Sequence, residues 1–292
     1  MIRAGFATAM KMGFLLAAWC AVLWTSTGNA AFRESAHAGQ PEPPAALASP
    51  ATPEASSLGR TLSQNGIAPG SAKAHMLTAW FEMVLHDPSI AMRIGGGPAS
   101  LERIFVDEGK REALMSSGLA RLAPQERLLY LQLFTRLLDE FVPVNCFGLV
   151  DMSAVMNHIT ISQMSDPDAA LYLQLLYRVL VSTTSDAPVR LPTQQEYAGA
   201  LEALSLAIVI ELDGDTASLD RYRTYTRQPS TATPSDVCWM TRVTLHAIAK
   251  MPESERDVIL LTVITASPLR ALTDPAQAPR DSPDKHREEG IP

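Results

Sequence analysis

The stretch LYLQLFTRLL at residues 129–138 decides the fold, because a close copy of it, LYLQLLYRVL, returns at residues 171–180. Seven of the ten positions are identical, at an offset of 42 residues. Each copy follows a proline, Pro124 or Pro167, and proline is favoured in the first turn of a helix, where its missing N–H costs no hydrogen bond. The pattern predicts two related helices, and the alternative is chance similarity between two leucine-rich helices.

Helical periodicity continues on both sides of this pair. Apolar side chains share one helix face over residues 76–84, and Pro88 ends that run. A further helix is predicted over residues 101–114, ending near Gly118. Weaker echoes of the repeat lie at residues 191–210 and 251–264.

Strand signals are weak. Residues 158–162 (HITIS) and 222–226 (YRTYT) alternate between polar and apolar types, but neither is long enough to make a sheet. We therefore expect an all-α fold over residues 60–272. It is either a helical bundle or a set of stacked helical hairpins resembling a short α-solenoid, closed by one disulfide.

The N-terminal segment, residues 1–30, has the composition of a secretory signal peptide. Arg3 and Lys11 precede an apolar run at residues 12–24, and small residues follow at 28–30. The run is shorter than the roughly 20 residues that a membrane-spanning helix needs. The segment predicts export to the bacterial periplasm or beyond, with cleavage near Ala30 and no membrane anchor in the mature chain.

Two flanking segments lack the apolar side chains that a core requires. Residues 31–59 are rich in Ala and Pro, and residues 273–292 are rich in Pro and charged groups. Neither segment buries enough apolar surface to offset the entropy of ordering. We expect a disordered linker before the helical domain and a disordered charged tail after it.

The cysteine content predicts one disulfide. Of three cysteines, Cys20 lies in the predicted leader, so Cys146 and Cys238 remain for the mature chain. An oxidising compartment favours pairing them. The bridge closes the loop between Cys146 and Cys238, and in the chain-entropy model a loop of this length adds about 4–5 kcal/mol of stability. The alternative is two separate buried thiols.

The charge of the chain bears on its partners. The predicted leader carries two cations and no acids. The rest of the chain has 22 Lys plus Arg and 31 Asp plus Glu, which gives it a net charge of −9. Nucleic-acid-binding surfaces need a basic footprint, so we expect no nucleic-acid partner. An acidic surface instead favours a basic protein partner, by steering encounter.

Known catalytic and metal-binding patterns are absent from the sequence. It has no GxSxG serine elbow and no phosphate-binding glycine loop. His75 and His86, with nearby methionines, would suit copper, and the acidic residues 211–220 would suit calcium. Core packing and a solvated turn explain these two groups better, so we predict no catalytic residue, cofactor or metal, and more likely no enzyme.

Two groups of residues are candidates for binding a protein partner. Aromatic and arginine side chains alternate in the predicted loop at residues 220–227 (DRYRTYTR), and both types are enriched at binding hot spots. The repeated helices each carry an arginine on a polar stripe. The alternative is an ordinary solvated connector and the wet side of amphipathic helices. The candidate residues are Arg136, Arg178, Arg221, Tyr222, Arg223 and Tyr225.

These observations favour a non-catalytic protein-binding module of the bacterial envelope, either an inhibitor or immunity-type protein or an adaptor. The alternative is a periplasmic carrier that holds a lipid or another hydrophobic ligand in a helical cavity. The oligomeric state is left open by the sequence.

Overall fold

The computed structural model describes residues 62, 63, 65–94 and 108–273, and within these ranges the chain is all-α, with no strand. The predicted fold class is therefore confirmed. The leader, the linker and the tail lie outside the described residues. The helices are α3 (Ala72–His86), α4 (Pro88–Ile94), α6 (Glu108–Arg121), α7 (Pro124–Phe141), α8 (Met152–Met156), α9 (Asp166–Ser182), α10 (Gln194–Glu211), α11 (Thr216–Arg227), α12 (Pro234–Lys250) and α13 (Glu253–Thr273).

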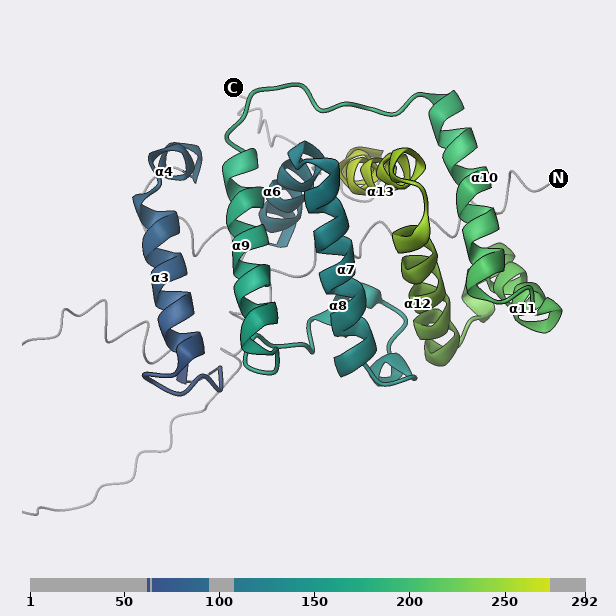
Figure 1. The fold of residues 1–292 in the computed structure, drawn as a ribbon, viewed down its shortest axis with the longest axis horizontal. Helices are drawn as coiled ribbons and strands as arrows, with labels where there is room; N and C mark the ends of the chain where they lie inside the picture. The colour runs from purple at the N-terminus through teal and green to yellow at the C-terminus, as the bar shows by residue number, and fades with distance from the viewer. Residues whose placement is uncertain (1–61, 64, 95–107, 274–292) are drawn as a thin grey trace, which may run out of the picture.

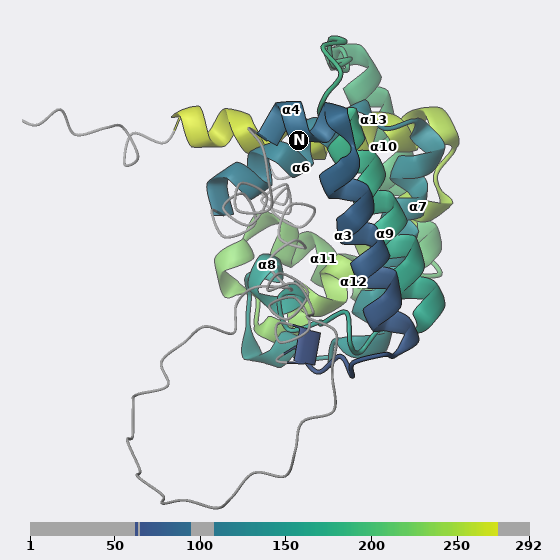
Figure 2. The ribbon, with the colours of Figure 1, turned by 90° about the vertical axis from the view of Figure 1, so that its left-hand side faces the viewer.

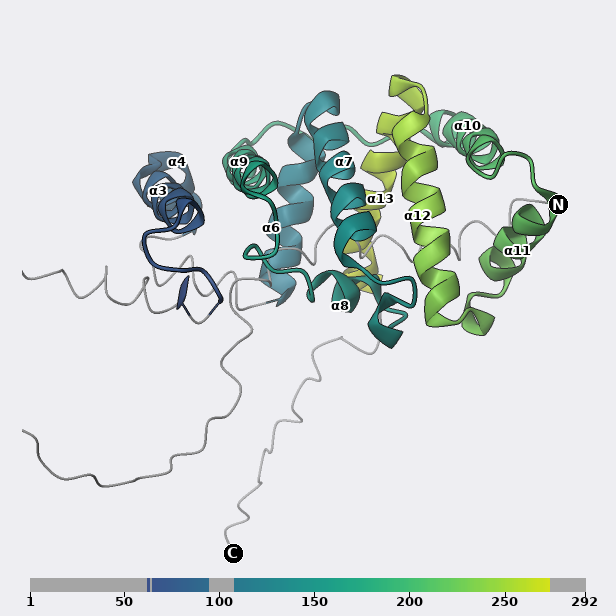
Figure 3. The same ribbon diagram turned by 60° about the horizontal axis from the view of Figure 1, so that its bottom comes forward.

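The helices form a bundle of two layers. One layer is a row in the order α3, α9, α7, α12 and α10, in which each helix contacts the next (Figure 1). Behind the row, α6 packs against α9, and α13 packs against α6, α7 and α10 (Figure 3). Figure 2 looks at the row from its α3 end, with α4 lying across the top of α3. Since α9 sits between α3 and α7, neighbours in space are not neighbours in sequence, and the array is a bundle rather than a solenoid.

The repeated segments lie in α7 and α9, which pack side by side and run antiparallel. Two ion pairs join them: Arg136 to Asp168, with an N–O distance of 3.2 Å, and Arg178 to Glu126. Each residue of one pair lies 42 positions from its counterpart in the other. The two copies are thus related by a local two-fold rotation, in which equivalent residues exchange the same contact.

A glycine lets α6 and α9 approach closely. A side chain built at Gly118 would place its Cβ only 2.3 Å from the carbonyl oxygen of Val179 and 2.6 Å from its Cγ1. The sequence predicted that this helix ends near Gly118, which is wrong, because α6 continues to Arg121. Gly118 is a packing residue within the helix, and the first part of the prediction, residues 101–107, lies outside the described residues.

A buried ion pair joins α6, α7 and α13. The Arg127 guanidinium donates from Nε and Nη2 to the two carboxylate oxygens of Asp257, at 2.8 and 2.9 Å. Its Nη1 donates to the carbonyl oxygens of Ala120, at 3.2 Å, and of Leu122. Both side chains are buried, so the charges are satisfied by each other and by the C-terminal carbonyls of α6.

Two local predictions are corrected by the structure. Residues 158–162, which alternate like a strand, form turns between α8 and α9. Residues 222–226 lie within α11, so they are neither a strand nor a loop.

The predicted disulfide between Cys146 and Cys238 is confirmed. It links the short 3-10 turn Cys146–Gly148, which follows α7, to the first half of α12, with a Cα–Cα distance of 5.6 Å. Both cysteines are fully buried. The bridge therefore ties the centre of the row to the helix next to its α10 end.

We predict opposite effects for alanine at two helical glycines. Gly118→Ala should lower the free energy of unfolding by about 1–3 kcal/mol, because the new methyl group overpacks the contact with Val179. Gly199→Ala, in α10, should raise it by up to about 1 kcal/mol, because nothing lies within 4 Å of the new Cβ. Urea unfolding followed by circular dichroism measures both. Equal effects at the two sites would contradict the close approach of α6 and α9.

We also predict that the mature chain contains no free thiol. Protein recovered from an oxidising compartment without residues 1–30 should titrate no thiol when denatured, and two after reduction. The double variant Cys146→Ala/Cys238→Ala should lose about 2–5 kcal/mol of stability. Two freely titrating thiols before reduction would show that the bridge does not form.

Candidate functional site

Several large apolar side chains are exposed on α10, the last helix of the row. Its inner face packs on α12 and α13 through buried residues such as Leu204 and Ile208. On its outer face, Leu206 is 62% exposed, Val209 37% and Ile210 61%. The spacing i, i+3, i+4 puts these three side chains on one face. We call them the α10 patch.

Residues 203–210, in the second half of α10, read ALSLAIVI, in which serine is the only polar residue, so this part of the helix is apolar on nearly all sides. A helix that is apolar all round is normally enclosed on all sides. The signal was therefore present in the composition, but it becomes an exposed patch only because α10 lies at the end of the row (Figure 1).

Acidic residues flank the α10 patch along the helix. Glu202 lies one turn before Leu206 on the same face, and Asp213 and Asp215 follow in the turn after α10. All three acids are exposed. Neither Glu202 nor Asp213 forms an ion pair with any residue that the structure describes. An apolar patch is thus bordered by negative charge at both ends.

The segment rich in arginine and tyrosine anchors α11 to α12 rather than forming a loop. Tyr222 is only 7% exposed, and its hydroxyl shares a hydrogen bond of 2.6 Å with Thr244. The Arg221 guanidinium stacks on the Trp239 ring, 4.4 Å from its centroid, and Nε donates to Asp236 at 3.1 Å. Arg221 and Tyr222 therefore hold α11 against α12.

The other predicted residues of α11 are more accessible. Arg223 is exposed and pairs with Asp220 on the same helix, at 3.1 Å. Tyr225 is half-buried. A partner-binding role for α11 stays a prediction, and the structure leaves Arg223 and Tyr225 better placed for it than the buried Tyr222.

Arg136 and Arg178 lie on the outer surface of the row, and each is about half exposed. Their guanidinium groups are engaged with Asp168 and Glu126 across the contact between α7 and α9. They lie at opposite ends of that contact, and the α11 residues lie beyond α12 at the far end of the row (Figure 3). The six predicted residues therefore do not form one surface.

A second exposed apolar segment follows α7. Val144 and Phe147 are exposed, and the Phe147 ring stacks on His158 with a centroid distance of 4.6 Å. Cys146, Phe147 and Gly148 all have positive φ, between 49° and 78°. The first two have side chains, and such backbone is strained; the disulfide at Cys146 helps to hold it.

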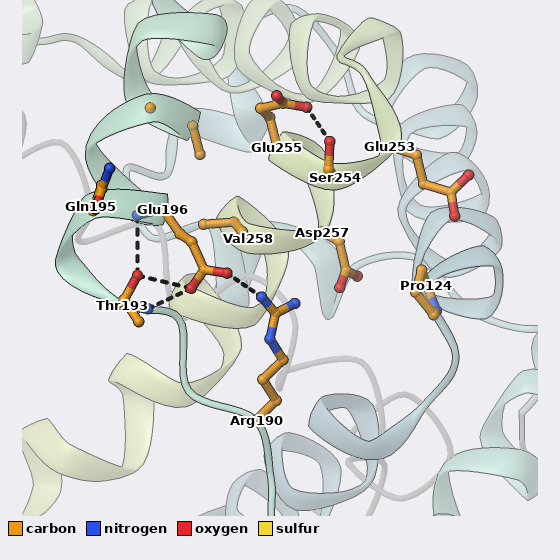
Figure 4. Close-up of a pocket in the computed structure, with 12 residues that line it drawn as sticks. Pro124, Arg190, Thr193, Gln195, Glu196, Glu253, Ser254, Glu255, Asp257 and Val258 are labelled. Carbon is orange, nitrogen blue, oxygen red and sulfur yellow. Dashed lines mark hydrogen bonds and ion pairs between the residues drawn. The ribbon is translucent and has the colours of Figure 1, made fainter.

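An open pocket of about 760 Å³ lies where the first turns of α7, α10 and α13 meet (Figure 4). Its walls include Pro124, Glu196, Glu253, Glu255 and Arg190. The positive ends of three helix dipoles and several carboxylates thus face the same space. The lining is polar and charged at most positions.

The carboxylates of this pocket are already engaged. Glu196 and Thr193 form a capping box at the start of α10. The backbone N–H and the hydroxyl of Thr193 donate to the Glu196 carboxylate and hold its pKa below the usual value. The Ser254 hydroxyl likewise lowers the pKa of Glu255. A carboxyl that is held ionised is not suited to act as a general acid.

Between residues 62 and 94, leaving out 64, and between 108 and 273, no three His, Cys, Asp or Glu side chains are grouped to hold a metal ion. In the same ranges, no helix has the length and apolar character needed to cross a membrane.

Comparisons with known proteins place this chain in no group: no family model, no curated protein and no solved structure matches it.

The anchor of α11 generates a prediction about pH. Burial by itself would raise the pKa of Asp236, but hydrogen bonds from the Thr233 hydroxyl and from Arg221 outweigh it and hold the pKa well below its usual value. A carboxyl with a depressed pKa in the folded state stabilises the fold above its unfolded pKa of about 3.9, and the contribution is lost as the pH falls through the folded-state pKa.

Asp236→Asn should therefore lower the free energy of unfolding by about 1–3 kcal/mol at pH 7 and at pH 5. The difference from the unmodified protein should shrink as the pH falls below about 4, because the carboxyl of the unfolded chain then takes up a proton while that of the folded chain stays ionised. Urea unfolding at four pH values measures this, with Asp220→Asn as the exposed control, for which we expect a small effect. A difference that is the same at every pH would refute the role of the charge.

Proposed function

We propose that this protein is an exported, non-catalytic protein-binding module of the bacterial envelope, of the inhibitor, immunity or adaptor type, and that it binds its partner through the α10 patch. The single observation that carries the proposal is the exposure of Leu206, Val209 and Ile210 on one helix face. Large apolar side chains gathered on the surface of a folded chain are typical of interaction sites.

The position of the patch supports this proposal. α10 is held on its inner side by α12 and α13, so its outer face is presented by a helix that is already packed. A side chain that is fixed before binding loses little conformational freedom when a partner covers it. The α10 patch is therefore preorganised for contact.

The disulfide supports the proposed location. Disulfides form and persist in the periplasm and outside the cell, and they are rare in the reducing cytosol. The bridge between Cys146 and Cys238 is buried, as expected of a structural disulfide. Together with the leader-like composition of residues 1–30, it favours export.

The carrier alternative receives less support. The pocket between α7, α10 and α13 is open and is lined by carboxylates such as Glu196 and Glu253. A lipid tail would need an enclosed apolar lining, because carboxylates are costly to desolvate. No feature of this pocket favours a hydrophobic ligand.

Site-specific photo-crosslinking in the cell that makes the protein tests the proposal. A photoreactive phenylalanine analogue at position 206 or 210 should give an adduct with one other polypeptide, identified by mass spectrometry. The matched controls are positions 92 and 144, where Met92 and Val144 are at least as exposed but lie away from α10. We expect the same adduct to be at least tenfold weaker at these positions.

Two outcomes would overturn the proposal. If positions 206 and 210 give no protein adduct in the cell, the α10 patch does not contact a protein partner. If all four positions give the same adducts in equal amounts, the crosslinks report random collision. Adducts that contain lipid alone would support the carrier instead.

A further inference from the structure

We infer that the occupant of the α10 patch is an amphipathic helix of the partner protein, with basic residues on both sides of its apolar stripe, which packs beside α10 as the next helix of the row. The inference rests on the proposed function and names the partner of the same site. It is carried by the geometry of the row, by the spacing of the apolar residues and by the placement of the acids.

The row explains why the occupant is a helix. Each helix between α3 and α10 is covered on both sides by a neighbour in the row, whereas α10 has one only on its α12 side (Figure 1). Leu206, Val209 and Ile210 form the i, i+3, i+4 ridge by which helices pack into each other's grooves. A further helix would continue the packing that holds α12 against α10.

The acids explain why the occupant is basic at two positions. Glu202 lies one turn before the patch, and Asp213 lies in the turn that follows the end of α10 at Glu211, where its φ of 49° takes the chain out of the helix. Both acids are exposed and without an ion-pair partner among the described residues. A helix with Lys or Arg on both sides of an apolar stripe matches this pattern of charge.

The same acids argue against a second copy of the chain as the occupant. A two-fold contact between two α10 helices places Glu202 of one copy near the acidic turn of the other if the helices are antiparallel, and near Glu202 of the other if they are parallel. Like charges at such a contact oppose association. A basic helix removes this repulsion.

A synthetic helical peptide of about 18 residues provides the probe. One peptide carries lysines on both sides of a Leu and Ile stripe, and its twin carries glutamates in place of the lysines. We expect the lysine peptide to bind the purified full chain at least tenfold more tightly than its twin, by fluorescence anisotropy. Its affinity should fall as salt is raised, because the paired charges are exposed.

Three variants of the protein sharpen the test. The double variant Leu206→Ser/Ile210→Ser should lose at least tenfold in affinity for the lysine peptide. Glu202→Lys should weaken the binding of the lysine peptide and strengthen the binding of the glutamate peptide. A general loss of structure weakens the binding of both. Glu140→Lys, at an exposed acid of α7, is the matched control and should leave the preference for lysine unchanged.

The outcomes separate this inference from the proposed function. Equal binding of the two peptides, binding that ignores the double variant, or a dimer in sedimentation that the double variant dissociates would each overturn the inference. If positions 206 and 210 crosslink to a partner while both peptides fail to bind, the patch is a binding site but its occupant is not a basic helix. If no partner crosslinks, the proposed function itself has failed.

Discussion

The buried pair of Arg127 and Asp257 is the constraint on which the arrangement of the bundle depends. A guanidinium and a carboxylate that leave water need each other and further hydrogen bonds, and breaking such a pair strands a buried charge. Here the remaining donors of Arg127 reach the C-terminal carbonyls of α6, so one side chain joins α6, α7 and α13. The start of α13 is thereby fixed, and α10 packs against α13.

The two-fold relation between α7 and α9 forms the centre of the row. Equivalent ion pairs close both ends of their contact. Other helices are added on either side of this pair. At one end of the row, α3 exposes His75, Glu82 and the apolar Met83, and at the other α10 exposes the three apolar residues of the patch on one helix face.

Residue types alone did not show which side chains are exposed. Arginine and tyrosine are frequent at interfaces because they combine a large apolar area with a polar group. The same property suits them to hold two helices of one chain together, as Arg221 and Tyr222 do between α11 and α12. Conversely, Leu206 and Ile210 look like core residues and are exposed. Exposure depends on the neighbours of a helix, which composition does not describe.

The sequence by itself determined the local structure of the protein. The periodicity of apolar residues, the prolines at helix starts and the box of Thr193 and Glu196 specify helices through contacts within a few residues. The pairing of Cys146 with Cys238 followed from counting, because the third cysteine, Cys20, lies in the predicted leader. Such inferences need no knowledge of which helix lies beside which.

Only the tertiary structure decided the order of the helices, the antiparallel meeting of the two repeats and the exposure of the α10 patch. A leucine is equally compatible with a core and with an interface, and the difference is whether another helix covers it. At Gly118, likewise, the absence of a side chain reads as a helix end in the sequence and is a close contact with Val179 in space. Long-range packing, which joins residues far apart in the chain, supplies this information, and a single sequence does not display it.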